Sequence, residues 1–493
     1  MLFNSTQFIV FFPLVGLLYF LLPHRLRWVL LLGASYFFYM SWEPGYVVLL
    51  MISTAAAYAG GLLIEKARGR GRGWWLAAGL GINFSLLFFF KYYNFFSGQL
   101  RPLLTSLGVD FSLPPSRFLL PLGISFYTFQ ACSYLIDVYR GKQKAERHPG
   151  LFALYVSFFP QLVAGPIERA PNLLPQLRAL ACAGERHKFD YDAATSGLKL
   201  MAWGFFKKIV IADRLAVVVD QVYGQPGSYG GPALTVATVC FAFQIFCDFS
   251  GYTDIAIGCA RMLGFRLMNN FRRPYFAASV ADFWRRWHIS LTSWFRDYVY
   301  IPLGGNRVGE GRWRINIAVV FLLSGLWHGA NWTFLAWGAI HAGYIIIGKL
   351  TMPVREKLTA ALGLPRAPRV HHAIRMASTF ALVCFAWIFF RAHSVGDAVG
   401  IVRGLISGWG AVIEPARMYE VVRSMGVLPQ DLAIFAALIA ILEVAHVCQA
   451  KGVTLDWLSR RPLPVRWVLY SALIWTIVIF GVFRQKEFIY FTF

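Results

Sequence analysis

His328 is the first of two histidines through which this sequence could perform chemistry. It lies in FLLSGLWHGAN (residues 321–331), inside a run from Ile315 to Gly348 that contains no Asp, Glu, Lys or Arg. One bilayer crossing needs about 20 apolar residues, so this run places the imidazole at membrane depth. Polar groups are costly there and usually face a cavity or a partner group. Gly325 and Gly329 would let a second helix or a substrate approach closely, although the same pattern is typical of a structural histidine on a helix-packing face.

His288 is the second candidate, in SVADFWRRWHISLTSWFRDYVY, which starts at Ser279. Aromatic residues recur there at three- and four-residue intervals and arginines cover the other faces, which predicts an amphipathic helix at the membrane interface. Ser279 followed by Asp282 indicates the helix N-cap. His288 is the one residue of this stretch able to exchange protons near neutral pH. Its spacing alone favours a hydrogen-bonded structural role over a catalytic one.

The composition is that of a polytopic membrane protein. Of 493 residues, 57% are hydrophobic, 17% aromatic and only 14% charged, whereas soluble proteins average roughly a quarter charged residues. Hydrophobic runs cover the whole length, so we expect one membrane domain over residues 1–493. The seven cysteines lack the spacing of a zinc site or of a disulfide framework, and no metal site is expected.

The net charge of +23 is carried by short segments between the hydrophobic runs. In a soluble protein such a charge would indicate binding to nucleic acid, but this sequence has no soluble basic module that could bind it. Cations in these positions are instead what the positive-inside rule and contact with anionic membrane lipid require. An anionic ligand such as a nucleotide-bearing acyl donor would also be favoured there.

Five apolar runs near the N-terminus, the first three of them uncharged, predict membrane helices. They are followed on one side by basic loops at Arg25/Arg27, 65–72 and 140–149, and on the other by weakly charged segments. The positive-inside bias therefore places the three basic loops in the cytoplasm and the N-terminus outside. The runs are residues 1–23, 28–42, 44–64, 73–96 and 118–139.

The middle of the chain holds less regular segments. Pro160, Gly165 and Pro166 predict either a re-entrant helix or a kinked span over 151–167. Lys207 and Lys208 are expected at the cytoplasmic end of a helix. Two aspartates that follow in a membrane-like pattern, Asp248 and Asp254, are expected to pair with arginines or to cap helices rather than to bind metal.

The whole pattern predicts an all-α polytopic protein with about ten to twelve crossings. We expect N-terminal helices over 1–149, a catalytic core with both histidines over 150–349, and C-terminal helices over 350–493. Five further histidines have no supporting context and are expected to be structural or solvent-exposed: His341, His371, His372, His393 and His446.

Several motifs in register resemble one family. They include LVAGPIER from Leu162, FFKKIVIADRLA from Phe205, CDFSGYTD from Cys247, NNFRRPYF from Asn269 with the stretch around His288, and SGLWHGANWTFLAWGAIHA from Ser324. Together they resemble the membrane-bound O-acyltransferases. The most similar branch is the bacterial one, with the membrane subunit of alginate O-acetylation and, more distantly, the D-alanyl transfer protein of teichoic acid modification.

The resemblance implies a ring of helices, with re-entrant and interfacial helices, around a central tunnel in the cell inner membrane. It implies transfer of acetyl from cytoplasmic acetyl-CoA, with no permanently bound cofactor, to a periplasmic serine-hydrolase-like acetyltransferase and then to a polysaccharide acceptor. His328 matches the family's active-site histidine, and His288 matches the second histidine of the bacterial branch.

Acyl transfer needs a base near the attacking oxygen, and a neutral imidazole in an apolar tunnel can serve. We therefore assign the base to His328, while His288 would orient the donor or acceptor or share the proton. Arg273, Arg285 and Arg286 would hold the anionic parts of the acyl donor. Two other functions remain open: a transporter of an acyl donor, which broken helices and intramembrane histidines also fit, and D-alanyl transfer to teichoic acid. A structural scaffold would tolerate loss of both histidines.

Overall fold

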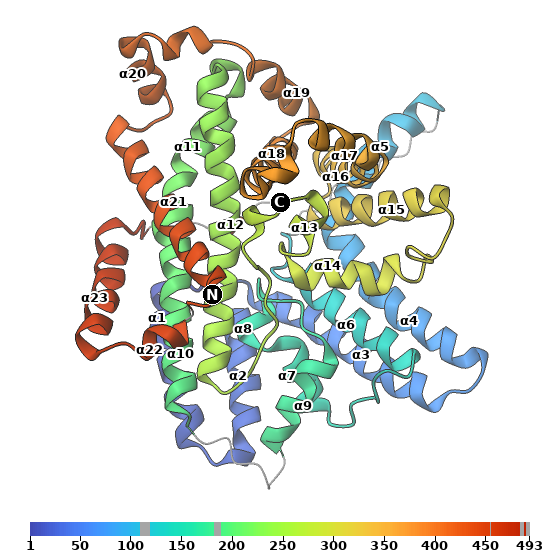
Figure 1. Cartoon of the computed structure of the whole chain (residues 1–493). Coiled ribbons are helices and arrows are strands. Elements are labelled where there is room, and N and C mark those ends of the chain that lie inside the picture. The colour runs from blue at the N-terminus through green and yellow to red at the C-terminus, as the bar shows by residue number, and fades with distance from the viewer. Residues whose placement is uncertain (109–118, 182–188, 454, 484–487, 490–493) are drawn as a thin grey trace. The chain divides into compact units, whose positions relative to one another are not determined.

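A computed structural model describes residues 1–108, 119–181, 189–453, 455–483 and 488–489 (Figure 1). Within these ranges the chain is helical and contains no strand. Among the described residues, seven helical segments are long and apolar enough to cross a membrane, and the apolar helix Thr6–Leu21 is shorter. The expected all-α polytopic architecture is therefore confirmed. The seven segments are Pro44–Lys66, Arg70–Ser106, Gly231–Met262, Trp332–Leu350, Pro368–Arg391, Pro429–Ala450 and Leu463–Phe480.

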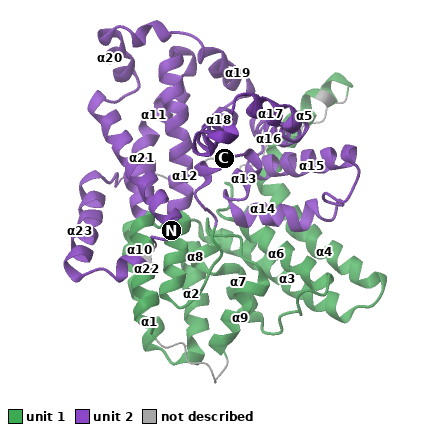
Figure 2. Ribbon diagram, viewed as in Figure 1, with its two compact units in different colours: residues 1–204, 252–269 green, residues 205–251, 270–493 purple. Residues whose placement is uncertain are grey.

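The chain forms two compact units, which Figure 2 colours separately. Unit 1 contains Met1–Gly204 and Tyr252–Asn269, and unit 2 contains Phe205–Gly251 and Asn270–Phe493. The helices up to the end of unit 1's first segment are α1 (Thr6–Leu21), α2 (Arg27–Met40), α3 (Val47–Lys66), α4 (Arg70–Leu87), α5 (Tyr93–Ser106), α6 (Ile124–Tyr139), α7 (Pro149–Ser157), α8 (Phe159–Leu162), α9 (Ala170–Ala181) and α10 (Tyr191–Phe205).

One long helix, α12 (Gly231–Met262), contributes its first part to unit 2 and its second part to unit 1. The other helices of unit 2 are α11 (Asp213–Gly224), α13 (Val280–Trp284), α14 (Ile289–Phe295), α15 (Glu310–His328), α16 (Trp332–Leu350), α17 (Met352–Ala361), α18 (Pro368–Arg391), α19 (Val395–Gly404), α20 (Pro415–Ser424), α21 (Pro429–Ala450), α22 (Leu455–Ser459) and α23 (Leu463–Phe480).

The N-terminal helices of unit 1 follow the predicted runs. Helices α3, α4 and α6 pack side by side (Figure 1). The run expected over 73–96 forms α4, which continues through a π-helical turn at Phe88–Tyr92 into α5. The segment around Pro160 is a broken helix: α7 ends at Ser157, Phe158 leaves the helical conformation, and α8 lasts only four residues.

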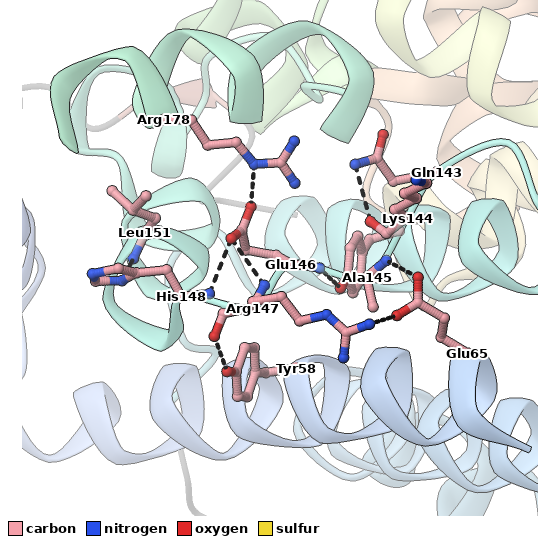
Figure 3. A network of polar contacts seen from close by, with 11 residues as sticks. Tyr58, Glu65, Gln143, Lys144, Ala145, Glu146, Arg147, His148, Leu151 and Arg178 are labelled. Atoms are coloured by element: carbon pink, nitrogen blue, oxygen red, sulfur yellow. Dashed lines mark hydrogen bonds and ion pairs between the residues drawn. The ribbon is translucent and has the colours of Figure 1, made fainter. Parts of the chain in front are cut away.

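A polar network in unit 1 fixes the basic loop at residues 140–148 (Figure 3). The buried Glu146 carboxylate accepts the backbone N–H groups of the next two residues at 2.9 and 3.0 Å and the Arg178 Nε–H at 2.6 Å. Arg147 forms an ion pair with Glu65 of α3. Both acidic residues of this region are thus engaged with arginines, and the loop is held to α3 and α9.

A second buried carboxylate in unit 1, that of Glu168, holds the chain that follows α12. It accepts the Met268 backbone N–H at 2.5 Å and the Asn172 side-chain N–H at 2.6 Å. Burial raises the pKa of Glu168 to about 7, against these hydrogen bonds, which lower it. The segment leading to Asn269 is thereby fixed against the N-terminal end of α9.

Unit 2 buries a lysine that the sequence placed at a helix end. Lys207 and Lys208 are 4% and 2% exposed, in a π-helical turn that follows α10. Lys208 lies 2.9 Å from Asp213 and 2.6 Å from Asp248. The two lysines were expected at a helix end, but both are buried, because Lys208 pairs inside the fold with Asp213, five residues on, and with Asp248 of α12. Asp248 does have the expected structural pairing, with a lysine in place of an arginine.

Candidate active site

His328 is the last residue of α15, and its side chain is 3% exposed. Helices α15 and α16 lie side by side (Figure 1). A Cβ atom at Gly325 would approach the backbone carbonyl of Phe334 in α16 closer than 3.0 Å, and one at Gly329 would meet the Phe334 ring. The two glycines thus permit close approach of a second helix, as the sequence indicated.

Aromatic rings surround the His328 imidazole. Its ring centroid lies 5.0 Å from Trp327, 5.1 Å from Trp337 and 5.2 Å from Phe390. All three rings are buried. The His328 imidazole is therefore packed among aromatic side chains and shielded from solvent.

His288 lies between α13 and α14, where the sequence had predicted one continuous helix. That prediction was wrong: His288 has φ 42° and ψ 56°, in the left-handed region, and the chain turns there. The predicted N-cap is confirmed, since the Ser279 hydroxyl accepts the Asp282 N–H at 3.1 Å. Two short helices replace one because the turn directs the His288 side chain into the core, where it is fully buried.

The two histidines contact the same indole. Trp327 lies 5.8 Å from the His288 ring and 5.0 Å from the His328 ring. His288 also packs edge-on against Phe249, with the ring centroids 4.6 Å apart. Burial lowers the pKa of His288 to about 3, so this imidazole is neutral at physiological pH.

The three arginines expected at a donor site belong to the same unit but have separate surroundings. Arg285 is exposed and its Nε–H donates to the Ala281 carbonyl at 3.3 Å. Arg286 pairs with Asp282 at 2.9 Å. Arg273 is half-buried and has a left-handed backbone with φ 49°. The N–H of its neighbour Arg272 donates to the Arg286 carbonyl at 2.9 Å, which brings these two segments together.

A cavity of about 630 Å³ lies within unit 2, next to the end of α15. Its polar wall contains Lys208 and Asp248, and its apolar wall contains Phe334 and Phe390. His328 does not line it, but the Phe390 ring contacts His328 and also faces the cavity. Among the described residues, no three His, Cys, Asp or Glu side chains form a group that could hold a metal ion.

Comparison with known proteins decides the family. The model of the membrane-bound O-acyltransferase family (MBOAT) matches residues 148–395, which include both histidines. A probable alginate O-acetylase of Pseudomonas putida is 40% identical over 411 residues, which are 83% of this chain and 80% of the relative. The chain belongs to the MBOAT family. It is a multi-pass membrane O-acyltransferase that uses an acyl donor, as the motifs indicated.

Other relatives of this MBOAT protein transfer acyl groups to different polymers, as their names state. A peptidoglycan O-acetyltransferase of Helicobacter pylori is 34% identical over 82% of this chain and 80% of the relative. A teichoic acid D-alanyltransferase of Streptococcus thermophilus is 31% identical, but over only 46% of this chain and 56% of the relative.

The sequence did not indicate three features of this MBOAT site. Trp327 entered the sequence analysis only as a letter of the motif around His328, although its indole contacts both histidines. Phe390 lies on α18, far along the chain, and no spacing rule connects it to the imidazole. Asn270 hydrogen-bonds to the residues beside His288. The one signal for it was an asparagine within the NNFRRPYF motif.

Proposed function

We propose that this MBOAT protein moves an acetyl group from cytoplasmic acetyl-CoA across the cell inner membrane for O-acetylation of an alginate-like polysaccharide outside the cytoplasm. The observation that carries the proposal is the pair of buried histidines on one indole, beside a cavity. Two relatives that each match more than four-fifths of this chain are named as O-acetylating enzymes, which supports acetyl as the group transferred.

His328 is the proposed general base. It takes the proton of the attacking hydroxyl as that oxygen adds to the thioester carbonyl. The C–S bond then breaks, and the thiolate of the departing coenzyme receives the proton. A neutral imidazole can accept this proton.

His288 is the proposed second member of the site. Its neutral ring orients the donor or acceptor, or shares the proton. Arg273, Arg285 and Arg286 are the proposed contacts for the phosphates of acetyl-CoA, because guanidinium groups bind phosphate with paired hydrogen bonds. Arg286 would exchange its Asp282 partner for a phosphate.

The cavity of unit 2 is the proposed entry for the acceptor. The proposed acceptor is a serine hydroxyl of a periplasmic serine-hydrolase-like acetyltransferase, which passes the acetyl group to the polysaccharide. Phe390 contacts His328 and also lines the cavity, so the imidazole lies one side chain away from this space.

Purified protein, reconstituted with its periplasmic partner and given acetyl-CoA labelled in the acetyl group, tests this function. We expect label on the partner and then on polymer hydroxyls. Transport of the donor would instead move intact labelled acetyl-CoA into vesicles without transfer. Label transferred only from a D-alanyl donor would indicate the teichoic acid activity.

A further inference from the structure

The backbone around His288 is held in a conformation that side chains disfavour. Among the described residues, only His288 and Arg273 have positive φ without being glycine. Such conformations persist only where the surrounding structure enforces them, and they occur often at functional sites. Something near His288 must therefore supply that constraint.

Asn270 supplies this backbone constraint on the C-terminal side of His288. Its backbone carbonyl accepts the Ile289 N–H at 2.9 Å. Its side-chain Oδ1 accepts the Ser290 hydroxyl at 2.6 Å and the Ser290 N–H at 3.3 Å. Asn270 is 1% exposed and Ser290 is fully buried, so water does not compete for these bonds.

A backbone hydrogen bond fixes the chain on the N-terminal side of His288. The Arg272 N–H donates to the Arg286 carbonyl at 2.9 Å, two residues before His288. The segment from Asn270 to Arg272 therefore holds the chain on both sides of the histidine. With both sides fixed, the turn at His288 directs its ring against Phe249 at 4.6 Å and toward Trp327.

We propose that Asn270 is a positioning residue for the transfer reaction, which holds the His288 imidazole in place through Ser290. This inference rests on the proposed function of His288. The simpler alternative is that Asn270 only satisfies the first N–H groups of α14. That alternative predicts a loss of stability with unchanged turnover, because an N-cap acts on the helix and not on the ring before it.

Four variants test the proposal: N270A, N270D, S290A and, as a matched control, N269A at the exposed neighbouring asparagine. We expect N270A to lower kcat about ten- to hundredfold with little change in KM, because misplacing a reacting group by about 1 Å can cost a hundredfold. N270D retains an acceptor for Ser290 and should keep most of the activity. S290A should lose less than N270A, because it removes the hydroxyl bond to Asn270 Oδ1 but keeps the bond from the Ser290 N–H. N270A/S290A should lose no more than N270A, since N270A alone already removes both bonds.

A cryo-EM structure of N270A provides the deciding readout. A fall in kcat together with displacement of the His288 ring from Phe249 supports the proposal. Unchanged kcat overturns it, as does a fall in kcat with the ring in place. If the N270A protein does not accumulate in the membrane, kcat and the position of the His288 ring are compared between wild type and S290A instead. Activity in H328A would instead refute the proposed function, so the two failures are distinguishable.

Discussion

Replacing Gly325 with alanine should separate α15 from α16 and displace His328. The added Cβ would lie closer than 3.0 Å to the Phe334 carbonyl oxygen, which belongs to the backbone of α16 and cannot rotate away. Restoring van der Waals contact requires a shift of about 1 Å. A shift of that size costs about a hundredfold in rate when it moves a reacting group. Overpacking of this kind also lowers the free energy of unfolding by about 1–3 kcal/mol.

Gly343 provides a matched control on α16, because a Cβ there meets nothing within 4 Å. We expect G343A to keep full activity and to melt at the same or a higher temperature, since alanine is favoured over glycine inside helices. The assay is transfer of labelled acetyl from acetyl-CoA, with thermal unfolding in detergent measured on the same preparations. Wild-type turnover in G325A would refute the reasoning that glycine-mediated packing places His328.

Three further changes test other parts of the structure. Between pH 7.5 and pH 5, the free energy of unfolding of the wild-type protein should fall by about 2 kcal/mol more than that of H288Q. The reason is that the pKa of His288 falls from 6.5 to about 3 on folding, so that only the unfolded chain binds the proton in this pH range. An equal fall in both proteins, measured by chemical denaturation, would contradict this. K208M should lower the free energy of unfolding by about 3–5 kcal/mol, because it removes the cation with which the buried Asp213 and Asp248 carboxylates pair. Adding D248N to K208M should restore part of the lost stability. Wild-type stability in K208M would oppose this reasoning. E146Q should speed tryptic cleavage in the loop 140–148, since it weakens the ion pair with Arg178; an unchanged cleavage rate would mean that other contacts order this loop.

Much of the helical framework could be predicted because it follows from local composition. Apolar runs separated by short charged loops correspond to α1 to α4, and the prolines near 160 mark the break between α7 and α8. The contact of Gly325 with α16 also follows from spacing, since residues four apart share one face of a helix.

Features that depend on partners distant in sequence could not be predicted. The expected helix around His288 is interrupted because Asn270 binds the backbone after it, and no periodicity reports that contact. Lys208 was placed at a helix end, yet Asp248, forty residues away along the chain, pairs with it in the interior. In both cases tertiary contacts override the local pattern.

The central claim is that the His328 imidazole accepts the proton during acyl transfer. The most direct test is transfer of labelled acetyl from acetyl-CoA to the periplasmic partner by purified H328A, with the exposed histidine variant H372A as control. We predict no transfer above background in H328A, with wild-type thermal unfolding, and full transfer in H372A. Transfer at the wild-type rate by H328A would contradict the account.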